Sequence, residues 1–185
     1  MSAEFIVRCM SEVVRKLDPA TLARIGSHSH TLRISLEGSG LNLMDAPHSV
    51  ELMDQVWEKL VEYPVPPDTH EWLVTAFAAL LAEQLAALYS FRWKELVDVH
   101  GASPCLVENR TGVRVFPFDS VLRRLQSEER VFFGPYLAQI ERVMKEHGLS
   151  PRNAPSAASS NIHVTAVPAP EASSAPAQKP WWKVW

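Results

Sequence analysis

The chain has 185 residues, of which 46% are hydrophobic and 21% are charged, and its formal net charge is −3. At ~150 residues per domain this length leaves room for one ordinary globular domain, and the composition excludes a chain that is disordered or coiled-coil throughout. Residues from Pro151 onward carry a formal charge of +2, which leaves the body at −5. An acidic body disfavours nucleic acid as a partner, because proteins that bind it present a basic surface.

The first predicted element is an amphipathic helix over residues 4–17, where apolar side chains recur at steps of three and four. The Asp18-Pro19 pair is expected to stop this helix. Residues 32–37 alternate apolar and polar side chains, which is typical of a half-buried strand. Gly38-Ser39-Gly40 would turn this strand back into residues 41–43 and form a hairpin.

Two further helices are predicted in the middle of the chain. One begins near Asp45 or Ser49 and carries an apolar stripe up to Val61, before a proline-rich break at residues 63–67. The other begins at a capping-box-like Asp68 and continues to Leu88. Its wide apolar set predicts the central core helix, with Trp72, Phe77 and Leu81 in the core. The apolar stretch is interrupted by polar residues and shorter than the ~20 residues that a membrane span requires.

Three short strands are predicted next, at residues 93–99, 105–108 and 113–118, with turns at 101–104 and 109–112. They form a β-meander. Asp119 is expected to cap a helix that runs through Leu125, and a last helix from about Gly134 to His147 ends on Gly148. The sequence therefore predicts a single α+β domain over residues 1–150, with about five helices and a small antiparallel sheet made of a hairpin and a three-stranded meander.

Composition changes after Ser150. Proline, alanine and serine dominate residues 151–180, which predicts a disordered linker because such a segment buries too little apolar surface to offset the entropy of ordering it. A tryptophan-rich peptide follows at residues 181–185. Tryptophan dominates binding hot spots, so Trp181, Trp182, Lys183 and Trp185 are predicted to bind another protein. Docking on the chain's own body and contact with a membrane surface are the alternatives.

Part of the body resembles a module of small uncharacterised bacterial α+β domains. The resemblance runs from the helix ending at Leu88 through Trp93, the turn at Gly101, residues 113–118 and the helix after Asp119. It implies a compact α+β fold. Some of these domains lie near toxin and immunity systems, and the resemblance carries over no catalytic residues.

Few residues point to catalysis. His28 and His30 would lie on one face of a strand, as metal ligands can, but a solvated turn is the favoured interpretation because no third ligand is near. Cys105 with His100 resembles a nucleophile and its base, yet the apolar context of Cys105 favours a buried thiol. Asp98, near His100, would suit hydrogen bonding as well as acid–base work. No nucleotide-binding or common hydrolase motif is present, so neither a cofactor nor a metal is expected.

The predicted helix after Ser49 also has an acidic flank, formed by Glu51, Asp54, Glu58 and Glu62. Such a flank is usually a solvated face, and the functional alternative is a surface that meets a basic partner. Cys9 and Cys105 lack the spacing of a zinc site, and no signal-peptide pattern precedes them, so a cytoplasmic location is expected.

These observations favour a non-enzymatic adaptor or regulatory binding protein that uses the aromatic peptide as a tethered docking element. An immunity-type protein that neutralises a toxin through its acidic body is one alternative. A small hydrolase or metal-dependent enzyme is the other.

Overall fold

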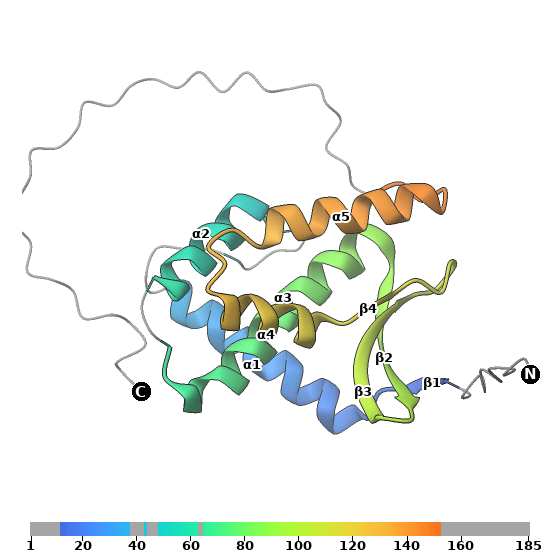
Figure 1. Ribbon diagram of the computed structural model, residues 1–185, viewed down its shortest axis with the longest axis horizontal. Helices are drawn as coiled ribbons and strands as arrows, with labels where there is room; N and C mark the ends of the chain where they lie inside the picture. Colours follow the sequence, from blue (N-terminus) through green and yellow to red (C-terminus); the bar gives the residue numbers. More distant parts are fainter. Residues whose placement is uncertain (1–11, 38–42, 44–47, 63–64, 153–185) are drawn as a thin grey trace, which may run out of the picture. The chain divides into compact units, whose positions relative to one another are not determined.

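We analysed a computed structural model, which describes residues 12–37, 43, 48–62 and 65–152. These residues form an α+β domain of five α-helices and a four-stranded antiparallel sheet, so the predicted fold class is confirmed (Figure 1). In chain order the elements are β1 (Val13–Lys16), α1 (Pro19–Glu37), α2 (Val50–Val61), the 3-10 helix η1 (Pro67–Thr69), α3 (His70–Tyr89), β2 (Phe91–Asp98), β3 (Gly101–Glu108), β4 (Arg114–Val115), α4 (Pro117–Ser127) and α5 (Phe133–Glu146). The tryptophan-rich peptide and the predicted linker, apart from Pro151 and Arg152, lie outside the described residues; the backbone N–H of Arg152 donates to the carbonyl of Leu88 at 2.9 Å.

Helix α3 is the centre of the core. It packs against α1, α4 and β2, and Phe77 and Leu81 are fully buried, as predicted. Trp72 is only half-buried and contacts the ring of His28. The segment Pro67–Tyr89 is long and apolar enough to span a membrane by length and composition, but 72% of that window is buried inside the domain. This apolar surface is therefore covered by the fold's own helices and sheet, as expected for a helix that is hydrophobic on all sides.

The hairpin predicted from residue 32 is wrong, because residues 32–37 belong to helix α1. Asp18 begins this helix and does not stop the one before it: its carboxylate accepts the backbone N–H of Thr21 at 2.9 Å, and Pro19 occupies the first turn. The buried residues of α1 recur at helical spacing. They are Ile25, Ser29, Leu32 and Leu36, whereas Ile34 is 54% exposed.

The helix predicted over residues 4–17 is wrong at its C-terminal end, since Val13–Lys16 form strand β1. Residues 4–11 lie outside the described part of the chain. Strand β1 pairs antiparallel with β2, with Val13 opposite Val97 and Lys16 opposite Lys94. Two β-branched residues in succession suit a strand, and pairing with β2 takes precedence over the helical spacing.

The predicted meander is confirmed in β2, β3 and β4, and so is its second turn at residues 109–112, but the first turn is misplaced. Residues 101–104 form no turn, because they lie in β3 and pair with β2 through Asp98 opposite Gly101. The tight turn falls on Val99 and His100, and the Asp98 carboxylate accepts the backbone N–H of His100 at 2.7 Å. Gly101 has a φ of +121°, which suits glycine and explains its position just after the turn.

The helices predicted at α2, α3, α4 and α5 are present in the structure, but some of their N-termini differ from the prediction. Ser49 caps α2 as one of the two predicted starts, but α3 is preceded by η1, and Asp68 makes no side-chain cap. Helix α4 begins at Pro117, so Asp119 lies in its first turn rather than at its cap. Gly148, with a φ of +71°, ends the last helix as predicted. Aromatic rings join α2, α3 and the start of α5, with the Trp57 and Phe77 ring centroids 5.2 Å apart.

Candidate functional site

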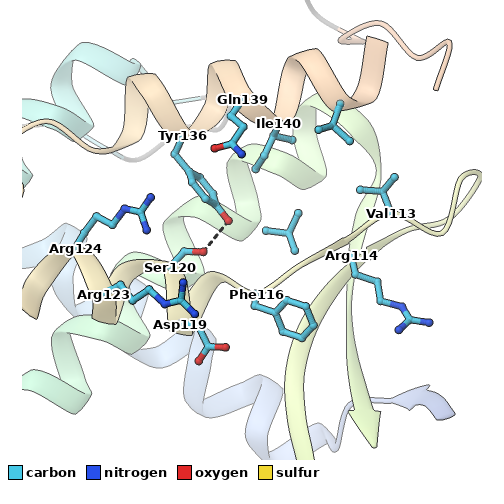
Figure 2. Close-up of a pocket in the computed structure, with 12 residues that line it drawn as sticks. Val113, Arg114, Phe116, Asp119, Ser120, Arg123, Arg124, Tyr136, Gln139 and Ile140 are labelled. Atoms are coloured by element: carbon cyan, nitrogen blue, oxygen red, sulfur yellow. Dashed lines mark hydrogen bonds between the residues drawn. The ribbon is translucent and has the colours of Figure 1, made fainter. Parts of the chain in front are cut away.

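The candidate site is an open cleft of about 340 Å³ between β4, α4 and α5 (Figure 2). Its volume falls within the range of pockets that bind small ligands or peptide side chains. The lining residues are Val113, Arg114, Val115, Phe116, Asp119, Ser120, Arg123, Arg124, Tyr136, Gln139, Ile140 and Val143. The lining therefore combines an apolar surface with arginine, amide and hydroxyl groups.

A tight turn positions the β4 wall. The carboxylate of buried Glu108 accepts the backbone N–H groups of Arg110 at 2.9 Å and Thr111 at 2.7 Å, together with the Thr111 hydroxyl. Burial alone would raise the pKa of Glu108, but these hydrogen bonds and the charge of Arg110 hold it below its ordinary value. Gly112, with a φ of +72°, completes the turn that returns the chain as β4. Glu108 thus acts as a structural anchor beneath the cleft.

The α4 wall supplies most of the charge. Pro117 is the first residue of α4, two residues after the end of β4, and Val121 and Leu125 of this helix are buried in the core. Arg124 lies 3.0 Å from the Glu129 carboxylate and stacks on the ring of Phe132 at 5.5 Å. Two cation–π contacts, the second with Tyr136 at 6.0 Å, hold this guanidinium in place.

The α5 wall depends on an unusual cap. Asp54 of α2 accepts the backbone N–H groups of Phe132 at 3.0 Å, Phe133 at 2.7 Å and Gly134 at 2.9 Å. A carboxylate at this position satisfies N–H groups that the helix itself leaves without partners and complements its dipole. Asp54 therefore fixes the N-terminal end of α5 against α2.

A hydrogen bond joins the two helical walls across the cleft. Tyr136 reaches from α5 to Ser120 on α4, with its hydroxyl 2.8 Å from the Ser120 oxygen, as Figure 2 shows. Burial raises the pKa of Tyr136, while Ser120 and the charge of Arg124 act in the opposite direction. The phenol therefore stays protonated near neutral pH and offers a neutral polar group at the bottom of the cleft.

The cleft lining has more arginines than acidic residues, although the body of the chain is acidic. Three arginines against Asp119 give the lining a formal charge of +2. Arg114 directs its side chain away from α4 and pairs with Glu12, and Arg124 pairs with Glu129. Arg123 is exposed and has no ion pair within the described residues. Its guanidinium is therefore the group that remains available to an anion.

The residues predicted to bind a partner are placed as follows. Trp181, Trp182, Lys183 and Trp185 lie outside the described residues. In the acidic flank, Glu51, Glu58 and Glu62 are exposed on or just after α2. Asp54 is half-buried as the cap of α5, so its prediction as part of an exposed acidic surface is wrong. The Ser49 hydroxyl donates to Glu51 at 2.9 Å, and together with a backbone hydrogen bond it lowers the pKa of Glu51.

The residue pairs that the sequence disfavours as metal ligands or catalytic groups are not brought together in the structure. His28 and His30 lie two residues apart on α1, where successive directions differ by about 200°, so they do not share a face as on a strand. Cys105 is fully buried in β3, and burial raises the pKa of its thiol. His100 is in the exposed turn at the far end of β3 from Cys105. The interpretation of Cys105 as a buried thiol is confirmed.

A second polar cluster lies between α1 and α3. Glu83 accepts the hydroxyl of Ser29 at 3.1 Å and pairs with Arg33, and the Glu83 carboxylate lies 3.6 Å from the ring of His48. Gln84 exchanges hydrogen bonds with the backbone of His48. These contacts explain how two polar residues are accommodated on the apolar core helix, because buried polar groups require partners.

Sequence reasoning missed the cleft residues, including Ser120, Arg123 and Tyr136. Ser120 and Arg123 lie on α4 and Tyr136 lies on α5, and no motif spacing in the sequence links these residues. Helix α2, whose Asp54 caps α5, is distant from both helices in sequence. Comparisons of the chain with protein-family models, curated proteins and solved structures found no match.

Proposed function

We propose that this protein is a non-enzymatic adaptor that binds a partner protein at two points. The cleft between β4, α4 and α5 forms one contact, and the tryptophan-rich peptide at residues 181–185 forms the other. The observation that carries this proposal is Arg123, an exposed guanidinium that has no ion pair among the described residues and lines the same cleft as the linked hydroxyls of Ser120 and Tyr136. The Ser120 and Tyr136 hydroxyls are held by their mutual hydrogen bond, so a ligand that binds them costs little conformational entropy.

The proposed tether adds strength through effective concentration. Its roughly 30 residues of proline-, alanine- and serine-rich composition span ~30 Å on random-coil scaling. A second contact made through such a tether experiences a local concentration on the order of millimolar, so two weak contacts give a durable complex. The adaptor therefore requires both the cleft and the peptide.

Affinity capture of the full chain from its own cells, with quantitative mass spectrometry, tests this proposal. We expect Arg123→Glu to lose a partner that the unmodified protein captures. The triple replacement Trp181→Ala, Trp182→Ala and Trp185→Ala should lose the same partner, because a hot-spot tryptophan contributes ~2 kcal/mol or more to binding. Arg142→Glu is the matched control, since Arg142 is exposed on α5 outside the cleft.

Stability measurements complete the test. The triple tryptophan variant should melt at nearly the same temperature as the unmodified protein if the peptide acts on a partner. A fall of several degrees would instead indicate that the peptide packs on its own body. Unchanged capture combined with weaker binding to anionic vesicles would indicate a membrane anchor, and either result would overturn the adaptor proposal.

A further inference from the structure

Strand β4 is an edge strand whose open side belongs to the cleft. Within the part of the chain that the structure describes, it is the last strand in the sheet order and its one partner is β3. Residues 113–116 contribute one wall of the cleft in an unbroken run. An edge strand exposes backbone N–H and C=O groups that a further strand can pair with.

The register identifies which of these groups face outward. The N–H of Glu108 donates to the carbonyl of Val113 at 2.9 Å, so these two residues form a hydrogen-bonded pair. Hydrogen-bonded and non-hydrogen-bonded pairs alternate along an antiparallel ladder. The next residue of β4, Arg114, is opposite Val107 and is therefore in a non-hydrogen-bonded pair. Its backbone N–H and C=O consequently point away from β3.

The opposite wall carries the groups that would select a bound strand. Arg123 of α4 offers an exposed guanidinium without an ion pair in the described part of the chain. Tyr136 and Ser120 contribute hydroxyls, and Ile140 and Val143 contribute apolar surface. In Figure 2 Tyr136 and Ile140 of α5 lie across the cleft from the β4 segment. A strand edge facing a helix is the arrangement by which many domains bind extended peptides.

Charge complementarity defines the kind of peptide. Arg114 pairs with Glu12 and Arg124 pairs with Glu129, so Arg123 is the arginine of the lining that has no ion pair among the described residues and can pair with a ligand carboxylate. We propose that an extended acidic segment of the partner protein adds as a fifth strand to β4. Its backbone pairs with the N–H and C=O of Arg114, and one of its carboxylates binds Arg123. This inference rests on the proposed function and specifies the ligand of its cleft.

Peptide titrations of the full-length protein, followed by NMR of its backbone amides, test the proposal. The probe is a short, capped peptide in which threonine and glutamate alternate, and the control peptide has lysine in place of glutamate. We expect the signals of Arg114, Val115, Phe116 and Arg123 to shift with the acidic peptide only. Failure of the acidic peptide to bind, or equal binding of both peptides, would overturn the proposal.

Two pairs of variants separate the backbone from the charge. Arg114→Pro and Arg114→Ala both remove the side chain, but only proline removes the outward N–H, at a position where an edge strand tolerates proline. We expect Arg114→Pro to bind the acidic peptide about tenfold more weakly than Arg114→Ala. Arg123→Glu should weaken binding at least tenfold, whereas Arg142→Glu should leave it unchanged. The proposal is overturned if Arg114→Pro binds as tightly as Arg114→Ala and Arg123→Glu binds as tightly as Arg142→Glu. If Arg114→Pro is unstable, the comparison of Arg123→Glu with Arg142→Glu still tests the proposal.

The outcomes also distinguish this inference from the adaptor proposal. If partner capture requires Arg123 and the tryptophan peptide while acidic peptides leave the β4 signals unshifted, the adaptor stands and strand addition is wrong. Sedimentation provides the remaining check. Self-association that rises with protein concentration and disappears in Arg114→Pro would assign the β4 edge to a second copy of the chain and overturn the inference.

Discussion

Asp54 is predicted to be one of the most stabilising polar residues of the domain. Replacing it with alanine leaves the N–H groups of Phe132, Phe133 and Gly134 without their acceptor in a partly buried site. Loss of a helix cap costs about 0.5–2 kcal/mol, and unpaired buried N–H groups add to this cost. We therefore expect Asp54→Ala to lower the free energy of unfolding by about 2–3 kcal/mol.

Denaturant unfolding followed by circular dichroism measures this change, and thermal melts should show a fall of roughly 5–10 °C. Asp54→Asn keeps the shape and one acceptor oxygen, so its cost should be about 1–2 kcal/mol. Glu58→Ala is the matched control, because Glu58 is an exposed carboxylate one turn further along α2, and it should change stability by less than about 0.5 kcal/mol. If Asp54→Ala costs no more than Glu58→Ala, the reasoning about the cap is refuted.

Three further predictions concern the core and the sheet. Leu81→Ala should cost about 2–5 kcal/mol in denaturant melts, because Leu81 is fully buried in α3, and a cost below about 0.5 kcal/mol would contradict that placement. The pKa of Glu108 is lowered in the folded protein, so its stabilisation is present above the ordinary glutamate pKa of about 4.3 and is lost as the pH falls through the lowered value. The free energy of unfolding that Glu108→Gln loses relative to the unmodified protein should accordingly be largest near neutral pH and shrink in acid. A loss that stays the same at every pH would contradict this prediction. Because burial raises the pKa of Cys105, its thiol should react with a maleimide only after denaturation, as mass spectrometry of the fragment that contains Cys105 would show.

The elements that were predicted correctly from the sequence are those whose apolar residues fit only one kind of secondary structure. Helix α3 is apolar on nearly every side, and Phe77 and Leu81 could be assigned to the core without tertiary information. Residues 32–37 fit two periods, since Leu32 and Leu36 match both a strand and a helix, and only the longer series from Ile25 distinguishes them. Strand β1 depends on pairing with β2, which is about 80 residues away, so local spacing could not identify it.

The candidate site was less predictable than the fold, because its parts become neighbours only through packing. Asp54 looked like one member of an exposed acidic series, and nothing in its local sequence indicates that it caps a helix about 80 residues later. Arg123 and Arg124 are adjacent in sequence but differ in the structure: Arg124 pairs with Glu129, whereas Arg123 has no ion pair in the described part of the chain. Such a difference follows from tertiary contacts that no residue spacing encodes.

The sheet has two open edges, and both carry cationic residues. Strand β1 includes Lys16 and β4 includes Arg114, and among the described residues each strand has a neighbour on one side only. Exposed edges promote aggregation between identical chains, and charged residues on them oppose it. Two molecules that approached edge to edge would bring these like charges together, while an acidic strand would meet no such repulsion. Concentrated solutions should therefore stay dispersed at low ionic strength and aggregate more readily as salt screens the edges.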